Sequence, residues 1–161
     1  MGIKGRRFSG QGERGQTLVE FALVFPLLML MLLGVVELGR GIYYYNSLSN
    51  LAREGARSGV VISTRINPQT AWDIDGNHEG TYSGITAYAG ANTIVGNVAS
   101  KAVAFDLSRM IVIINHDEGA WRNMALPLEV RVQYPFESLI TNWIGSSPTI
   151  TLTAQTTMRI E

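Results

Sequence analysis

One long apolar run dominates the hydrophobic pattern of this chain. The sixteen residues 21–36 carry no charge and lie between Glu20 and Glu37. At ~1.5 Å per residue the run covers roughly 24 Å, slightly less than the ~30 Å hydrocarbon core of a bilayer. Apolar character continues on both sides, and three tyrosines at 43–45 follow where interfacial aromatics are expected. Because the run is apolar on every face, it predicts a membrane-spanning helix, with its membrane part at about 18–42.

The helical pattern continues beyond this run. A narrow apolar stripe predicts one helix from about Thr17 to about Ser58, roughly 60 Å long. Pro26 removes a helix hydrogen bond, so a kink or a local loosening is expected there. The stripe consists of Ile42, Asn46, Leu48, Leu51, Ala52 and Ala56.

Two local features lie near the expected end of this helix. Glu37/Arg40 and Glu54/Arg57 are spaced i,i+3, so each pair can meet on the helix surface. The Gly55-x-x-x-Gly59 spacing permits close helix approach, but outside lipid it more often marks a helix C-terminus. The helix end is the favoured interpretation.

The remaining residues predict a small α+β head. Residues 63–84 are polar and rich in glycine, which indicates a loop, and Ile85–Phe105 resumes a helical pattern. Three strands are then expected, the second ending at Pro135-Phe136, with a turn at 115–119 between the first two. Their ranges are Met110–Ile114, Leu128–Tyr134 and Thr149–Arg159. The predicted fold class is α+β, a long N-terminal transmembrane or pilin-like helix followed by a small helix and an antiparallel sheet.

The charge is distributed unevenly, although the 161 residues sum to zero. Residues 1–15 carry a net +3 and the rest a net −3, which predicts that the N-terminus lies on the cytoplasmic side of a membrane. A nucleic-acid-binding tail is disfavoured because no second basic patch accompanies the leader. A cleaved signal peptide is disfavoured because no small-x-small site follows Val36. The absence of cysteine excludes disulfides and thiolate metal sites.

The residues before the apolar run carry a specific resemblance. Gly15-Gln-Thr-Leu-Val-Glu20-Phe21 follows the pattern of type IV prepilin processing sites: a glycine, four residues, then glutamate and an aromatic. The chain continues with Glu37-Leu-Gly-Arg40 and Ala52-Arg-Glu-Gly-Ala-Arg57. Together these segments resemble the TadE-like family of minor pilins, or pseudopilins, of tight-adherence pili.

The resemblance implies cleavage by a membrane prepilin peptidase between Gly15 and Gln16. The chain would then comprise a leader at 1–15, a pilin-like helix at 16–59 and an extracytoplasmic head at 60–161. Glu20 would become the fifth mature residue and pair with the terminal amine of a neighbouring subunit, beside Phe21 and Pro26 in the assembling helix. The implied partners are the membrane, the peptidase and other pilin-like subunits, with no cofactor.

The segment 73–79, which we call the acidic loop, is the one candidate metal site in the sequence. A calcium loop uses alternating carboxylates and a turn-forming glycine, but the spacing here does not follow an EF-hand, and a solvated acidic turn is favoured. The weak calcium candidates are Asp73, Asp75, Asn77 and Glu79.

Three function classes remain open, and an enzyme is the least favoured because no nucleophile stands beside a plausible base. A structural pilin-like subunit that serves adhesion or pilus assembly is preferred. An uncleaved single-pass anchor that displays a binding head is the alternative. The residues leave open whether such a subunit is major or minor in a filament.

Overall fold

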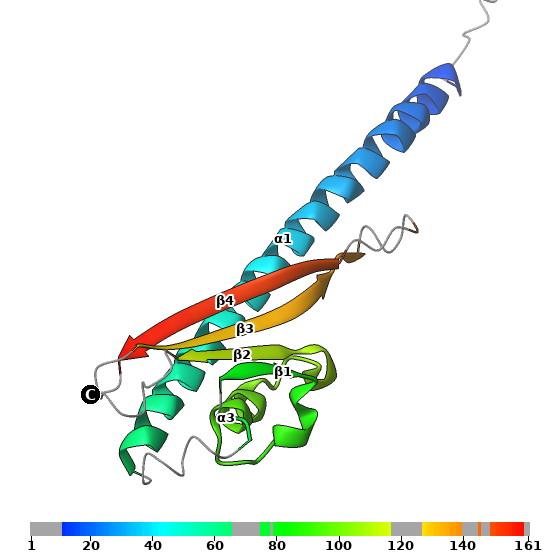
Figure 1. The fold of residues 1–161 in the computed structure, drawn as a ribbon. Helices are drawn as coiled ribbons and strands as arrows, with labels where there is room; N and C mark the ends of the chain where they lie inside the picture. Colours follow the sequence, from blue (N-terminus) through cyan, green and yellow to red (C-terminus); the bar gives the residue numbers. More distant parts are fainter. Residues whose placement is uncertain are drawn as a thin grey trace, which may run out of the picture. The chain divides into compact units, whose positions relative to one another are not determined.

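The computed structural model describes residues 11–65, 75–77, 79–116, 127–139, 145 and 149–159. The chain has the predicted α+β class: a long N-terminal helix is followed by a small helix and a four-stranded antiparallel sheet (Figure 1). Its contacts divide it into two compact units, which meet in sequence between Gly39 and Arg40. The second unit therefore includes the C-terminal part of the long helix, and we call this unit the head.

Helix α1 extends from Gln11 to Arg65, longer at both ends than the sequence pattern predicted. It continues through Pro26, where the proline lacks the N–H that would bond to the Ala22 carbonyl. The expected disturbance at Pro26 therefore does not interrupt the helix. Since α1 also runs past Gly59, the interpretation of Gly55 and Gly59 as a helix C-terminus is wrong.

The sheet has the strand order β1-β2-β3-β4, and every neighbouring pair is antiparallel. The strands are β1 (Gly80–Ser83), β2 (Ile111–His116), β3 (Pro127–Glu137) and β4 (Thr149–Arg159). The three predicted strands are thus confirmed. The prediction of an unbroken loop at 63–84 is wrong at both ends, because α1 reaches Arg65 and residues 80–83 pair with β2.

Two strand ends differ from the sequence expectation. β2 includes Asn115 and His116, which were predicted to lie in a turn. β3 continues through Pro135 to Glu137, although the proline was expected to end it. The pairing with β2 stops at Gln133, so Pro135 has β4 as its only partner among the described strands. A proline is tolerated there because its missing N–H removes no bond from a second ladder.

The single helix predicted at 85–105 is also wrong. The segment forms a 3₁₀ turn, η1 (Ile85–Tyr88), and a separate helix, α3 (Ile94–Lys101), before a second turn, η2 (Leu107–Arg109). Gly90 adopts a φ of 87°, which ends the first turn, and the Thr93 hydroxyl caps α3 by accepting from the Gly96 N–H. Ala87 and Ala91, which lie outside α3, are exposed.

The core of the head lies between one face of the sheet, α3 and the C-terminal part of α1. Alternate residues of β3 are buried, as is typical of a strand with one face against a core. The buried stripe of α1 begins at Leu48, whereas Ile42 and Asn46 are exposed. The buried hydrophobic residues of β3 and of the described part of α1 are Leu128, Val130, Val132, Tyr134, Phe136, Leu48, Leu51, Ala52 and Ala56.

Two glycines bring α1 close to its neighbours in this core. A Cβ at Gly55 would lie 2.9 Å from Val98 Cγ2 on α3 and 3.0 Å from Val130 Cγ1 on β3. A Cβ at Gly59 would lie 2.3 Å from Leu128 Cδ2. Small residues at this spacing let the helix backbone approach the sheet and α3, which is the other interpretation that the sequence allowed.

The ring of Tyr44 packs against the head core, N-terminal to the buried stripe of α1. Its ring stacks on Tyr134 with centroids 5.9 Å apart and meets Phe105 and Phe136 edge-on at 5.3 and 5.7 Å. Such pairs stabilise by about 0.5–1.5 kcal/mol beyond the buried area. The Arg40 guanidinium lies 5.3 Å from the Phe136 ring centroid. Of the three tyrosines expected at the membrane interface, Tyr44 therefore packs in the head. Tyr43 and Tyr45 are exposed and could lie at that interface.

Candidate functional site

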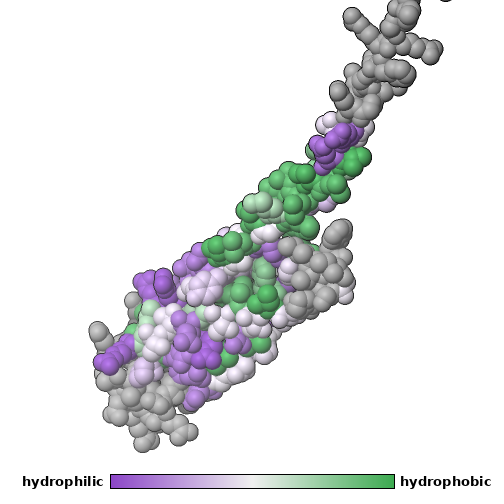
Figure 2. Space-filling view, turned by 90° about the horizontal axis from the view of Figure 1, so that it is seen from above, coloured by the Kyte–Doolittle hydropathy of each residue, from purple (hydrophilic) through white to green (hydrophobic). Residues whose placement is uncertain are grey.

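The N-terminal part of α1 presents apolar side chains on all its faces. The segment Gly15–Val61 contains a stretch long and apolar enough to cross a membrane, and none of that stretch is buried. Leu18, Leu23 and Leu27 are each about 70% exposed (69%, 74% and 70%). Figure 2 shows this helix as a mostly green, hydrophobic surface, with a hydrophilic group at its N-terminal end. Apolar surface of this extent requires lipid or protein to cover it.

The predicted processing residues lie at the N-terminal end of this apolar segment. A Cβ placed on Gly15 meets no atom within 4 Å. The Gln16 side-chain amide donates a hydrogen bond of 3.2 Å to Glu20 Oε1, one helical turn further on. Both residues are exposed, so the surface around the Gly15–Gln16 bond is open within the described residues. The structure thus brings Gln16 and Glu20 together, a contact that the sequence interpretation did not include.

The two other predicted assembly residues lie on the same exposed helix. Phe21 is 61% exposed, and its ring contacts Phe25 with centroids 5.3 Å apart. Pro26 is also exposed. The rings of Phe21 and Phe25 therefore form one aromatic ridge, immediately after Glu20.

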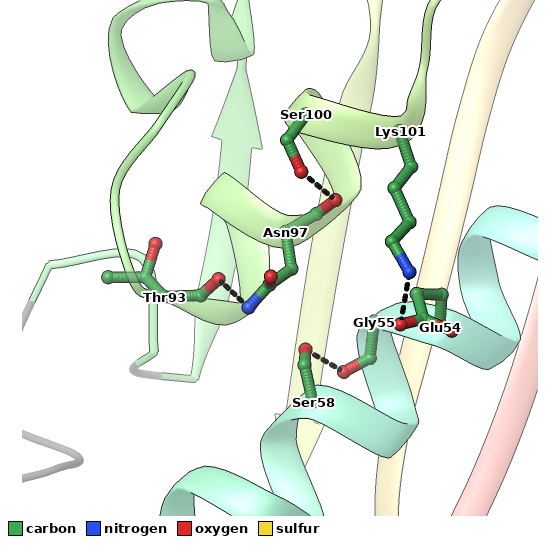
Figure 3. Close-up of polar contacts among 7 residues, drawn as sticks. All are labelled: Glu54, Gly55, Ser58, Thr93, Asn97, Ser100 and Lys101. Carbon is green, nitrogen blue, oxygen red and sulfur yellow. Dashed lines mark hydrogen bonds and ion pairs between the residues drawn. The ribbon is translucent and has the colours of Figure 1, made fainter.

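A cross-helix ion pair joins α1 to α3 in the head. Lys101 Nζ lies 2.5 Å from Glu54 Oε1, and Figure 3 shows the lysine reaching across from the end of α3. This hydrogen bond is the main reason why the pKa of Glu54 lies below its ordinary value near 4.5. The predicted partner Arg57 adds only a weaker electrostatic effect. Sequence reasoning missed Lys101 because 47 positions separate it from Glu54.

Replacing Lys101 with methionine is expected to lower the free energy of unfolding by about 0.5 kcal/mol at pH 7, a value typical of exposed pairs. Because the folded-state pKa of Glu54 is depressed, the pair stabilises the fold above the unfolded pKa near 4.5. This contribution is lost as the pH falls through the folded-state value. Urea unfolding of wild type and Lys101→Met at pH 7 and pH 3 measures it. A difference of equal size at both pH values would contradict the assignment.

The acidic loop takes part in folding α3. Asn77 is fully buried, and its Oδ1 accepts a 2.8 Å hydrogen bond from the Ile94 N–H at the start of α3. Asp75 accepts a 2.8 Å bond from the Tyr88 hydroxyl, which raises the pKa of Tyr88. Asn77 therefore is not the solvated residue that was expected. Glu79 is exposed, and Asp73 lies outside the described residues.

Within the described residues, no group of three or more His, Cys, Asp or Glu side chains is placed to hold a metal ion. Two of the calcium candidates, Asp75 and Asn77, already bond to protein groups. The calcium site stays a prediction that the structure does not test.

A shallow groove of about 350 Å³ lies beside the ion pair on the head. Its polar groups include Glu54 and Lys101, which bind each other. Val103, at its rim, is 92% exposed. The groove is lined by Tyr43, Ser47, Asn50, Leu51, Glu54, Lys101, Val103, Ala104 and Phe105.

The fold and the junction define a class of protein, in which an exposed apolar N-terminal helix with a prepilin-like junction is joined to a small α+β head. Residues 15–57 match the family model described as TadE-like protein, which confirms the resemblance over that segment. The match covers about a quarter of the chain, and this family is a structural, pilus-associated one. No curated protein and no solved structure matches the chain. The match and the helix are consistent with a pilin-like, membrane-anchored protein of tight-adherence pili.

Proposed function

We propose that this chain is a structural pilin-like subunit of a tight-adherence type IV pilus. A membrane prepilin peptidase cleaves it between Gly15 and Gln16, and the mature helix then packs against other pilin-like subunits. The observation that supports this most is the uncovered apolar surface of α1, which lies on both sides of Glu20 within the family match. The basic leader is cytoplasmic and the head lies on the opposite side of the membrane.

The exposed apolar helix has two successive partners in this proposal. Lipid can cover it while the chain is anchored, because a helix bonds its backbone polar groups internally, apart from those at its ends and the Ala22 carbonyl that Pro26 leaves without its N–H partner. During assembly neighbouring helices replace the lipid, and side-chain packing between the helices then stabilises the apolar segment. The carboxylate of Glu20 is costly in such a bundle unless a neighbour supplies a donor. The newly formed N-terminus of an adjacent subunit is that donor.

Replacing Gly15 with leucine is expected to leave most of the chain uncleaved. The peptidase must admit an extended backbone at the scissile bond, and a bulky side chain before that bond obstructs entry. Mass spectrometry of the membrane-extracted chain measures the N-terminus, which should be Gln16 in wild type. Gly12→Leu, in the same leader, is the matched control and should be cleaved normally. Normal cleavage of Gly15→Leu would contradict the proposed site.

The alternative function is an uncleaved anchor that displays the head to another envelope component. It predicts a wild-type chain that still begins at Met1, and such a result would refute peptidase-dependent assembly. If the chain is cleaved, electron microscopy of the overproduced, purified protein distinguishes the two filament roles. Filaments formed by this chain alone indicate a major subunit, and their absence indicates a minor one.

A further inference from the structure

Gln16 has a side chain that is free to change partners. It is exposed on the helix surface, and its one described hydrogen bond, to Glu20, is 3.2 Å long. That length is at the upper end of the normal range, and water competes for both groups. The carboxamide can therefore turn toward its own backbone nitrogen.

The proposed cleavage changes the chemistry of that nitrogen. In the intact chain it belongs to the planar Gly15–Gln16 peptide bond, whose lone pair is delocalised. After hydrolysis it is an α-amine with an ordinary pKa of about 7.7–8.0, so an appreciable fraction is neutral and nucleophilic at neutral pH. The first N–H groups of a helix also have no intrahelical acceptor. No backbone bond holds the new terminus in place.

We propose that the mature N-terminal Gln16 cyclises to pyroglutamate, an inference that rests on the proposed cleavage. The α-nitrogen attacks Cδ of the same residue and forms a five-membered lactam. The Cδ–Nε2 bond breaks, and Nε2 leaves as ammonia. The reaction needs no oxidant, no reductant and no second substrate.

Glu20 is placed to carry the proton in this reaction. Its Oε1 is the atom that accepts from Nε2, the leaving nitrogen. The carboxylate takes the proton that the attacking amine releases and donates it to Nε2, so Glu20 ends in its starting state. A positioned acid–base group of this kind typically accelerates a reaction by about a hundredfold or more.

Cyclisation alters what the mature terminus offers to a neighbouring subunit. The lactam has a neutral N–H in place of an ammonium group. A neutral group costs far less than a charge to place among apolar helices, and it still donates a hydrogen bond. Glu20 of the adjacent subunit would then accept from a lactam N–H.

Mass spectrometry of the mature N-terminal peptide tests this inference. The full chain is produced together with its peptidase, extracted from membranes and digested with chymotrypsin, which releases the six residues Gln16–Phe21. The wild-type peptide should be lighter by one ammonia and blocked to sequential degradation. A synthetic peptide of the same sequence, handled in parallel, measures cyclisation during the work-up. Gln16→Asn should keep its amine, because its ring would have only four members.

The outcomes separate this inference from the proposed function. A mature chain with an intact Gln16 amine overturns the cyclisation and leaves the cleavage standing, whereas a chain beginning at Met1 overturns both. For the proton transfer, a pulse-chase time course compares wild type with Glu20→Gln, which should cyclise at least about tenfold more slowly. Glu20→Asp should recover part of the rate. Equal rates in all three chains would overturn the role of the carboxylate.

Discussion

Replacing Gly96 with alanine is expected to destabilise the head by about 3 kcal/mol, at the upper end of the usual cost of overpacking. The expectation reverses the normal sign, since alanine in place of glycine stabilises a helix interior by about 1 kcal/mol. Gly96 lies in the first turn of α3, and a Cβ there would lie 2.1 Å from the Ala91 carbonyl oxygen and 2.9 Å from the Tyr88 carbonyl oxygen. Both atoms are backbone, so a rotamer change cannot relieve the overlap.

The capping arrangement makes this overlap costly. The Thr93 hydroxyl accepts from the Gly96 N–H, and the Asn77 amide oxygen accepts from the Ile94 N–H. Moving the Ala91 carbonyl away would displace Thr93, two residues further along the chain, and strain both caps. Loss of one cap alone typically costs about 1 kcal/mol.

Urea unfolding of the detergent-solubilised full chain, followed by circular dichroism, measures this effect. Gly41→Ala is the matched control, because Gly41 also lies in a helix and nothing lies within 4 Å of its added Cβ. The control should equal or exceed wild-type stability, by up to about 1 kcal/mol. If Gly96→Ala also equals or exceeds wild type, the tight contact at Ala91 is not a constraint on the fold.

Replacing Glu20 with alanine is expected to lower incorporation into filaments by roughly ten- to a hundredfold, the equivalent of a lost hydrogen bond to a charged group. The change leaves the terminus of a neighbouring subunit without its acceptor among apolar helices. Membrane insertion should be unaffected, because the apolar run after Glu20 is intact and an exposed carboxylate is removed.

Immunoblots of sheared filaments and of membrane fractions measure both quantities in the same cells. Glu37→Ala is the control, since Glu37 is the carboxylate at the opposite end of the same apolar run. It should assemble normally. Normal incorporation of Glu20→Ala would remove the proposed pairing role, and loss of membrane insertion would assign Glu20 to anchoring.

Two of the sequence-based predictions that are wrong concern contacts between distant positions. Glu54 was paired with Arg57 because both lie on one helix face, but its ion pair is with Lys101 on α3. Asn77 was assigned to a solvated turn, and it is buried as the cap of a helix that begins 17 positions later. Periodicity within a short window contains no information about partners on another element.

Strand ends were misjudged for the same reason. Residues 80–83 resemble a loop because Gly80 and the following Gly84 outweigh two residues with strand preference, and only pairing with β2 makes them a strand. A proline is expected to end a strand only where that strand pairs with a neighbouring strand on each side. The early end of β2 leaves it opposite β4 alone.

The apolar helix and the resemblance of its start to a prepilin processing site could be recognised from the amino-acid sequence alone. Length, composition and the Gly15-to-Glu20 spacing are local, so no tertiary contact was needed to recognise them, and the family match at 15–57 agrees. The roles of Gly55, Gly59 and Gly96 depend on contacts with other elements and could not be predicted from the sequence. A glycine in the sequence shows only that a side chain is missing at that position. The group that fills the resulting space can be a sheet residue, a second helix or a carbonyl oxygen. Which of these it is depends on the elements that pack against the glycine.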